Sequence, residues 1–254
     1  MPKIVEIATV IDNIRITDDV KKLVLSSPKI ATQARPGQFI HLKIGGSYDP
    51  LLRRPLSIAE ANSDKGTLGI YYRVVGRGTE LMAQLKSGDM VDNVGPLGQG
   101  FDLNCKRPLL IGGGMGIAPL VFLTQELCPR PIEVVLAGRT NQEMFWQDCF
   151  ARSCQDVHIT TDDGSLGFKG NALAVLPNLL DKKFDMIYVC GPKPMMSGVA
   201  KLASRAGIPC QVSLEEHMAC GIGACLSCTC AAGDGTRKKI CTDGPVFWAE
   251  EVVW

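Results

Sequence analysis

Residues 107–127, RPLLIGGGMGIAPLVFLTQEL, carry an apolar strand-like run into a glycine-rich turn and then into a helical segment. Pro119 suits the first turn of that helix, where a missing backbone N–H leaves nothing unpaired. Similar apolar runs recur downstream at 132–138, 157–164, 186–192 and 210–216, and helical segments separate them. Continuous apolar strands between helices predict a doubly wound parallel sheet, covered on both faces, over residues 101–213.

The turn in this stretch predicts a nucleotide site. Glycines let the backbone approach a pyrophosphate, and the helix that follows offers N–H donors at its start. The spacing departs from the Rossmann fingerprint, which would place its third glycine at Ile117. A second turn, CGPKP at 190–194, ends a later strand and supports the same site. Cys190 is either a contact to the bound nucleotide or a small strand-end residue. The candidate residues are Gly113, Gly114, Gly116, Cys190, Gly191 and Pro192.

The first hundred residues have a different pattern. Short alternating runs at 3–10, 21–27, 39–45, 67–76 and 90–96 are separated by Pro, Gly, Asp and Ser, which predicts an antiparallel β-barrel. His41 alternates within one run and has no partner histidine, so we expect a structural role. The stretches RRPLSI and GRGTELMAQLKSGD interrupt the pattern, and the second predicts a short helix. A basic side chain, a hydroxyl and a helix start would together bind a diphosphate. The residues concerned are Arg54, Ser57, Gly78 and Thr79.

Four cysteines near the C-terminus predict an iron–sulfur site. Cys220, Cys225, Cys228 and Cys241 are separated by four, two and twelve residues. This is the plant-type spacing for a [2Fe–2S] cluster, whose irons take four thiolates. The alternative is a structural zinc site, but zinc sites usually pair two short Cys-x-x-Cys spacings, and only one is present here. Using Cys230 instead would leave one of the four cysteines without a role.

Other residues of the chain point to no further metal ligand and no nucleic-acid or membrane partner. His217 is expected to be a solvated loop residue, and the scattered cysteines are expected to be small buried hydrophobes. The net charge is +1, and acidic and basic residues are mixed along the sequence. The sequence therefore shows no basic cluster of the kind that binds nucleic acid. Its apolar runs are shorter than a membrane span, and the N-terminus lacks the features of a signal peptide. We therefore expect a cytoplasmic protein.

The order of motifs along the chain resembles a known family. RPLS, GRGT, GGGMGIAP and CGPKPM, in that order, are similar to the ferredoxin reductase superfamily, in which a barrel binds flavin and the next domain binds a nicotinamide. RRPLSI, TDDGSLGFKG, SLEEHMACGIGACLSC and CTDGPVFWAEEVVW resemble the electron-transfer subunits of class 1B dihydroorotate dehydrogenases over essentially the whole chain. The resemblance implies that the four cysteines hold the cluster. It also implies FAD binding by Arg54, Pro55, Leu56, Ser57, Tyr71, Tyr72, Arg73, Gly78 and Thr79.

The resemblance also implies a function and a partner. NADH would reduce the flavin, and the cluster would relay single electrons to an FMN-containing dihydroorotate dehydrogenase catalytic subunit, in an assembly of two copies of each chain. Cofactors of this kind need positioning rather than acid–base groups. We therefore nominate no catalytic acid, base or nucleophile, and the adjacent Asp162 and Asp163 suit a turn.

Two alternatives to this reading remain: a reductase subunit that serves a hydrogenase, a sulfide-linked system or an oxygenase, and a zinc-stabilised binding module.

Domain limits and coenzyme complete the expectations. We expect a flavin barrel over residues 1–100, a nicotinamide domain over 101–213 and an iron–sulfur segment over 214–254. An acid often ends the second strand of sheets that bind NAD, where it contacts the ribose. Here Arg139 stands in that region, and it suits either a 2′-phosphate or a surface contact. The resemblance favours NADH.

Overall fold

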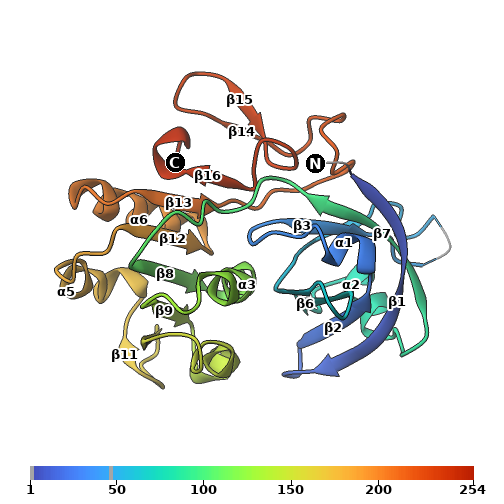
Figure 1. Cartoon of the computed structure of the whole chain (residues 1–254), viewed down its shortest axis with the longest axis horizontal. Helices are drawn as coiled ribbons and strands as arrows, with labels where there is room; N and C mark the ends of the chain where they lie inside the picture. The colour runs from blue at the N-terminus through green and yellow to red at the C-terminus, as the bar shows by residue number, and fades with distance from the viewer. Residues whose placement is uncertain (1–2, 46–47) are drawn as a thin grey trace. The chain divides into compact units, whose positions relative to one another are not determined.

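The computed structural model describes residues 3–45 and 48–254, and it divides into two compact units (Figure 1). Unit 1 comprises residues 1–100, 215–229 and 239–245. Unit 2 comprises residues 101–214, 230–238 and 246–254. The residues that follow position 214 are therefore shared between the two units. No helix in the described part of the chain has both the length and the apolar character that crossing a bilayer requires.

Among the described residues, unit 1 is built on a seven-stranded antiparallel sheet in the order β4-β3-β7-β1-β2-β6-β5. Alternate residues of the first strand face its core, because Ala8 and Val10 are buried while Val5 and Ile7 are exposed. Strands β4 and β6 also contact each other, so the sheet curls into the expected barrel. The strands are β1 (Ile4–Arg15), β2 (Val20–Ser26), β3 (Phe39–Leu42), β4 (Arg54–Ser57), β5 (Glu60–Asn62), β6 (Thr67–Arg73) and β7 (Met90–Leu97).

The RPLS stretch, expected to interrupt the strand pattern, forms edge strand β4 among the described residues and pairs there with β3. A proline fits an edge strand because half of the backbone groups there need no partner. The predicted short helix is confirmed as α2 (Arg77–Ala83), and a further short helix, α1 (Pro28–Ala31), follows β2.

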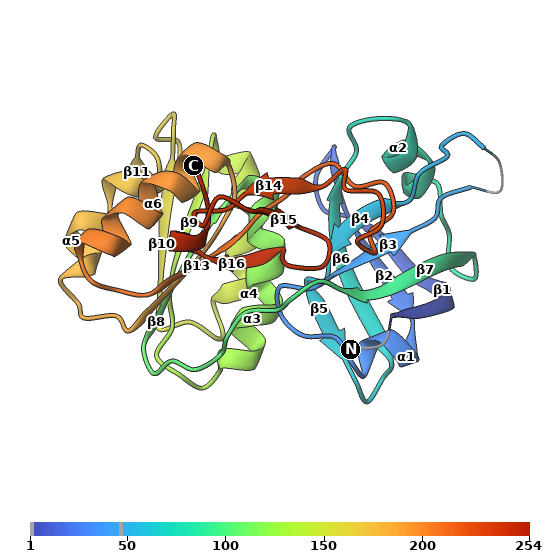
Figure 2. The same cartoon turned by 90° about the horizontal axis from the view of Figure 1, so that it is seen from above.

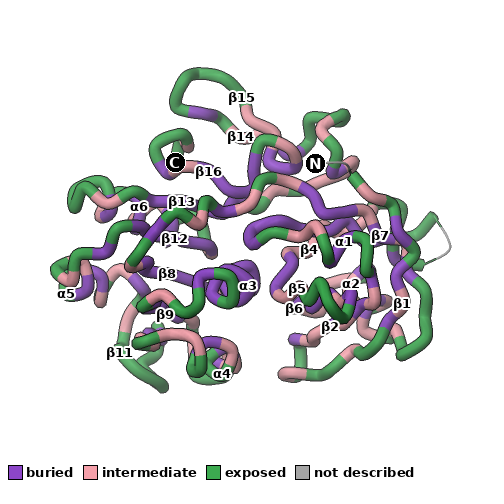
Figure 3. Tube along the Cα trace, in the orientation of Figure 1, coloured by how far each residue is buried: buried purple, intermediate pink, exposed green. Residues whose placement is uncertain are grey.

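Unit 2 contains the predicted parallel sheet, in the order β11-β10-β9-β8-β12-β13-β16. Each neighbouring pair is parallel except β13 and β16. The central strands β8 and β12 are buried along their whole length (Figure 3), as expected of a sheet covered on both faces. The strands are β8 (Pro108–Gly113), β9 (Glu133–Gly138), β10 (Asp156–Thr161), β11 (Phe168–Lys169), β12 (Met186–Cys190), β13 (Cys210–Ser213) and β16 (Val246–Trp248).

Helices cover both faces of this sheet. Helices α3 (Ala118–Leu127) and α4 (Gln147–Phe150) lie on one face, and α5 (Leu176–Leu180) and α6 (Lys193–Arg205) on the other (Figures 1 and 2). Four 3-10 turns accompany them in the described chain: η1 (Gly114–Ile117), η2 (Asn141–Trp146), η3 (Ala172–Ala174) and η4 (Ala249–Glu251).

The end of α6 shows how a single glycine sets a boundary. Gly207 has φ +67°, a left-handed conformation that costs glycine little. Its N–H donates to the carbonyl of Ser204, and the N–H of Ile208 donates to that of Ala203. These two bonds form a Schellman motif, which ends the helix and turns the chain toward β13.

The C-terminal segment contributes to both units. Strands β14 (Thr229–Ala231) and β15 (Arg237–Lys239) form a two-stranded sheet. Strand β16 then joins the large sheet of unit 2, with Val212 of β13 opposite Phe247. The four candidate cluster cysteines all belong to unit 1. Three antiparallel residues at the edge of a parallel sheet were not expected from the sequence, and the domain limits given above stay a prediction.

Candidate cofactor sites

Arg54 and Gly78 lie in contact within unit 1. The guanidinium lies over Gly78, where an added Cβ would make it shift. The guanidinium also donates to the carbonyl of Leu52. The preceding Arg53 pairs elsewhere, with Nη2 2.6 Å from Oδ2 of Asp92. The structure therefore places the cation of Arg54, and not that of Arg53, at the first turn of α2.

The other expected flavin residues lie on both faces of their strands. The Thr79 hydroxyl accepts from the N–H groups of Val75 (2.9 Å) and Gly76 (3.1 Å), so it holds the turn before α2. Successive residues of a strand point to opposite faces, so Tyr71 and Arg73 of β6 share one face and Tyr72 takes the other. The half-buried residues of β4 complete the set: Pro55, Leu56 and Ser57.

Tyr72 is buried, and its hydroxyl has a hydrogen-bond partner within unit 1. Its hydroxyl donates to Oδ1 of Asn13 at 2.9 Å, and burial raises its pKa to about 12. The structure thus brings Arg54, Gly78 and Thr79 together, and it engages the Tyr72 hydroxyl in a hydrogen bond with Asn13.

This part of unit 1 fits the flavin dinucleotide that the resemblance implies. Leu52 and Val75, both hydrogen-bonded through their backbones to the site residues, are 46% and 78% exposed. Ligand sites typically combine apolar surface for ring systems with a few placed polar groups. Here the Arg54 cation would bind the diphosphate of such a dinucleotide, and the exposed apolar side chains of Leu52 and Val75 would contact its rings.

In unit 2 the two glycine turns meet. A Cβ added to Gly116 would lie 2.6 Å from both the Cα and the N of Gly191. Gly114 has φ +57° and open space where a Cβ would stand. Strands β8 and β12 are neighbours with Gly112 opposite Cys190, so both turns leave the same edge of the sheet. That edge, at the carboxyl ends of parallel strands, is where doubly wound sheets bind dinucleotides.

Cys190 itself is buried, with only 1% of its surface exposed. Its Sγ lies 3.6 Å from the carbonyl of Ser213 on the neighbouring strand. Pro192 caps α6, and its Cδ lies 3.1 Å from the position of a Cβ on Gly113. The candidate residues of both turns therefore gather at one site, where the Cys190 thiol packs between strands.

The loop at 220–228 folds around the sulfur of its first residue, Cys220. Sγ of Cys220 accepts from the N–H groups of Ile222 (3.5 Å), Ala224 (3.3 Å) and Cys225 (3.4 Å). Gly221 and Gly223 have φ values of +68° and +88°, which permit the turns that aim these donors inward. Backbone N–H groups directed at cysteine sulfurs are a recognised feature of iron–sulfur sites.

The four sulfurs form two pairs. Cys225 hydrogen bonds to Cys220, and Cys241 hydrogen bonds to Cys228. Among the described residues, no three of these sulfurs lie within 4.8 Å of one another. Two pairs of thiols are the arrangement that the two irons of the expected [2Fe–2S] cluster would need.

Protonation of the cysteines reflects their surroundings. Hydrogen bonds from Ser227, first from its side chain and then from its backbone, lower the pKa of the exposed Cys225 to about 6. Burial raises the pKa of Cys241 to about 12, and a metal would have to displace that proton. Cys230 lies on β14 in unit 2 rather than with the four, and His217 is exposed as expected.

His41 is the residue near the cluster that the sequence did not reveal. Its side chain is buried, and a Cβ added to Gly221 would lie 2.5 Å from its Nδ1. The backbone of Cys220 hydrogen bonds to it, while burial and then Arg53 lower its pKa. The imidazole therefore packs against the cluster loop as a neutral group. A lone histidine in a strand carries no signal of this contact.

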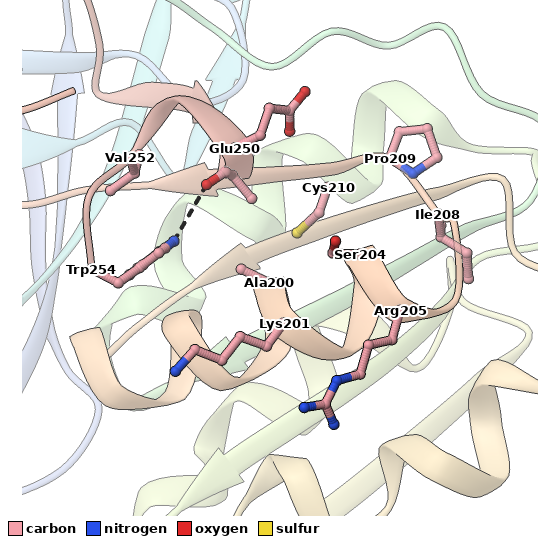
Figure 4. A pocket seen from close by; sticks show the side chains of 11 residues that line it. Ala200, Lys201, Ser204, Arg205, Ile208, Pro209, Cys210, Glu250, Val252 and Trp254 are labelled. Atoms are coloured by element: carbon pink, nitrogen blue, oxygen red, sulfur yellow. Dashed lines mark hydrogen bonds between the residues drawn. The ribbon is translucent and has the colours of Figure 1, made fainter. Parts of the chain in front are cut away.

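Unit 2 also holds a cavity of about 560 Å³ between α6 and the C-terminal residues (Figure 4). Lys201 and Arg205 of α6 line one side, and Trp254, whose Nε1 donates to the carbonyl of Ala249 at 3.3 Å, lines another. Cys210 is the first residue of β13, so this cavity opens at the amino end of that strand, away from the glycine turns. Burial raises the Cys210 pKa to about 12, which keeps the thiol protonated.

Comparison with protein-family models finds three matches along the chain. Residues 7–101 match an oxidoreductase FAD-binding domain, residues 110–201 an oxidoreductase NAD-binding domain, and residues 215–253 the iron–sulfur cluster binding domain of dihydroorotate dehydrogenase B. The expected cofactors are thereby confirmed: FAD, NAD(H) and an iron–sulfur cluster. The expected antiparallel flavin barrel and parallel nicotinamide sheet are confirmed as well.

Curated relatives agree over nearly the whole chain. The electron transfer subunit of dihydroorotate dehydrogenase B (NAD(+)) from Desulforamulus reducens is 44% identical over 236 residues, 90% of each chain. The subunit of the same name from Geobacillus thermodenitrificans is 42% identical over 96% of this chain and 97% of its own.

Among solved structures, one described as the NADH-dependent reduced ferredoxin-NADP oxidoreductase superposes with a TM-score of 0.85 at 32% identity, covering 98% of this chain and 90% of the other. The ferredoxin reductase of carbazole 1,9a-dioxygenase, at 22% identity and a TM-score of 0.69, shares the fold over 82% of this chain and 68% of its own. With identity of 38–44% to curated relatives over most of its length, the chain belongs to the family of electron-transfer subunits of NAD(+)-dependent dihydroorotate dehydrogenase B.

Proposed function

We propose that this chain carries electrons between NAD(H) and the FMN of a dihydroorotate dehydrogenase catalytic subunit, in the synthesis of pyrimidine nucleotides. The observation that carries the proposal is the four-cysteine loop, with its paired sulfurs and its match to the cluster domain of dihydroorotate dehydrogenase B. A flavin held by unit 1 would supply hydride exchange with a nicotinamide and the release of single electrons to a cluster held by the four cysteines. The chain's own residues bind these groups and supply no acid or base.

The residue assignments belong to this proposal. We assign the flavin to Arg54, Pro55, Leu56, Ser57, Tyr71, Tyr72, Arg73, Gly78 and Thr79, and the nicotinamide nucleotide to Gly113, Gly114, Gly116, Cys190, Gly191 and Pro192. The contact of Arg54 with Gly78 and the close approach of Gly116 to Gly191 support them. The iron ligands are Cys220, Cys225, Cys228 and Cys241. The domain limits at 100 and 213 are proposed with them.

The surface around the cluster loop suits a protein partner. Ile222 and Leu226 are 46% and 61% exposed, and both stand beside cluster ligands. Nζ of Lys3 donates to the carbonyl of Ile222 at 2.8 Å, which links the loop to the outer face of β1. Val5 and Ile7 are exposed on that face. Exposed apolar groups that lie near one another mark interaction surfaces, so we propose that the catalytic subunit binds the cluster loop and this face of β1, in an assembly of two copies of each chain.

The activity and the assembly can be tested on purified proteins. We propose a cytoplasmic protein, because the four proposed iron ligands must stay out of disulfides, as a reducing compartment ensures. Purified alone, the chain should reduce a dye with NADH. Mixed with the catalytic subunit, it should elute as a species whose mass equals two copies of each. A mixture that elutes as two separate proteins would contradict the partner assignment.

A second candidate comes from the structure with the TM-score of 0.85, which is described in terms of flavin-based electron bifurcation and ferredoxin-NADP reduction. A subunit of such a system would deliver electrons to an acceptor other than FMN of the catalytic subunit. Copurification from the native cell distinguishes the two, because the partner recovered would be either a dihydroorotate dehydrogenase or a second reductase.

A further inference from the structure

Arg139 stands where a bound dinucleotide would place its adenosine ribose. It follows Gly138 at the carboxyl end of β9, which lies parallel to β8 with Ala137 opposite Gly113. In doubly wound sheets the pyrophosphate sits at the turn of one strand and the adenosine ribose at the end of the next. The side chains around Arg139 therefore decide whether a 2′-hydroxyl or a 2′-phosphate is accepted.

The carboxylate of Glu143 holds Arg139 from two sides. Its Oε1 accepts from Nη2 (2.8 Å) and Nε (3.1 Å) of the guanidinium, and its Oε2 accepts from the backbone N–H at 2.9 Å. The Glu143 side chain is 13% exposed, compared with 73% for that of Arg139. The acid is thus the more firmly placed partner. A phosphate that sought the guanidinium would meet this carboxylate beside it.

A turn with two acidic residues is bonded through its backbone to the same strand end. The N–H of Asp162 donates to the carbonyl of Gly138 at 3.0 Å, and that of Asp163 donates to the carbonyl of Arg139 at 3.2 Å. Hydrogen bonds from Ser165, from its side chain and then its backbone, lower the pKa of Asp163, which is therefore ionised near neutral pH.

The remaining charge at this turn is basic. Lys169 packs against Gly164, whose added Cβ would lie 3.0 Å from Cβ of the lysine. The strand end and the turn bonded to it thus carry three acidic residues (Glu143, Asp162 and Asp163) and two basic ones (Arg139 and Lys169), and the Glu143 carboxylate contacts the guanidinium directly.

We propose that Glu143, with the Asp162–Asp163 turn, makes this subsite reject a 2′-phosphate and so selects NADH over NADPH. The proposal rests on the proposed function only in that the chain binds a nicotinamide nucleotide at the glycine turns. A 2′-phosphate would bring nearly two negative charges next to Glu143. A neutral ribose hydroxyl can instead donate to a carboxylate. Glu143 is thus a specificity-determining residue, and Arg139 is neutralised by its neighbour.

The test compares the binding of two mononucleotides to the full chain with its cofactors. Calorimetry gives the Kd of AMP and of adenosine 2′,5′-bisphosphate. Glu143→Gln keeps the shape of the side chain and removes one charge. It should tighten the bisphosphate relative to AMP by about tenfold, since like charges within a few ångströms change affinity by about that factor. Asp163→Asn should act in the same direction, and the rates of dye reduction with NADPH and NADH should shift in parallel.

Two further variants make the outcome specific. Asp148→Asn changes the same net charge at an exposed position of α4, and it should leave the ratio of the two Kd values within about twofold. Adding Arg139→Ala to Glu143→Gln should cancel the gain. The proposal is wrong if Glu143→Gln and Asp163→Asn both leave the ratio unchanged, or if Asp148→Asn shifts it equally. Because these measurements need no catalytic subunit, their failure is distinct from a failure to support dihydroorotate oxidation.

Discussion

The backbones of Gly116 and Gly191 approach each other so closely that a Cβ on Gly116 would lie 2.6 Å from the Cα of Gly191. Neither turn can therefore take a side chain at this point without moving the other. Gly116→Ala should separate the turns and raise the KM for NADH by about tenfold, as expected when a phosphate-binding backbone shifts. Dye reduction over a range of NADH concentrations measures this. Flavin and cluster absorbance should stay at wild-type values, and an unchanged KM would show that the close approach is not needed for binding.

We expect flavin retention to depend on the space over Gly78. A Cβ there would lie 2.3 Å from Nε of Arg54, so Gly78→Ala should displace the guanidinium from the proposed diphosphate site. Losing one charge-assisted contact weakens binding by about 2 kcal/mol, or about thirtyfold in Kd. Fluorescence titration of the apoprotein with FAD measures the change. The absorbance of the cluster serves as the internal control for folding, and wild-type FAD affinity would remove Arg54 from the site.

Cys228 and Cys230 form a matched pair of tests, because two residues apart they belong to different units. Cys228→Ser should abolish both the reduced-state EPR signal and the visible iron–sulfur absorption, since one iron would lose a thiolate. Cys230→Ser should preserve both signals. Survival of the signals in Cys228→Ser would remove this residue from the ligand set.

Acid stability should depend on Glu133. Its carboxylate, only 1% exposed, accepts from Nζ of Lys182 (2.8 Å), Nε2 of His158 (2.9 Å) and Nη2 of Arg107 (3.3 Å). Burial acts to raise the pKa of Glu133, but the hydrogen bonds from Lys182, His158 and Arg107 outweigh it and lower the pKa below its usual value.

A carboxyl whose pKa is lowered in the folded state contributes stability that is present above its unfolded pKa of about 4.3 and is lost as the pH falls through the lower, folded value. Wild-type Tm should therefore fall as the pH drops below about 4.3, whereas Glu133→Gln should start about 3 kcal/mol less stable at pH 7 and respond less to acid. Thermal melts at a series of pH values measure both. Parallel pH profiles for the two proteins would show that Glu133 does not contribute in this way.

The elements with strong periodicity were predictable from the sequence. The parallel strands and the glycine turn at 112–116 follow from apolar runs and from the space that glycine leaves, and the spacing of four cysteines predicts the ligand set. Strand β4 was harder, because RPLS has no alternation and contains a proline, and it becomes a strand only through pairing with β3. Strand β16 is three residues long, which is too short to show an alternating apolar pattern, and its pairing with β13 depends on tertiary contacts.

Contacts between distant residues were not predictable. The buried His41 lies against Gly221 although the two are far apart in the chain, and a single histidine gives no sign of this. Likewise, Arg139 alone is ambiguous about the coenzyme. The preference for NADH can be inferred only from the fold, which places Glu143 and the turn at Asp163 beside Arg139.

Dihydroorotate oxidation by the reconstituted pair tests the central claim most directly. The three matched domains of this chain are those for FAD, NAD and the cluster, and the orotate-forming chemistry is assigned to its partner. The isolated chain should not oxidise dihydroorotate, and adding the FMN-containing catalytic subunit should produce NADH from NAD+ when dihydroorotate is supplied. Turnover of dihydroorotate by the isolated chain, or a mixture that gains no NAD-linked oxidation, would contradict the account.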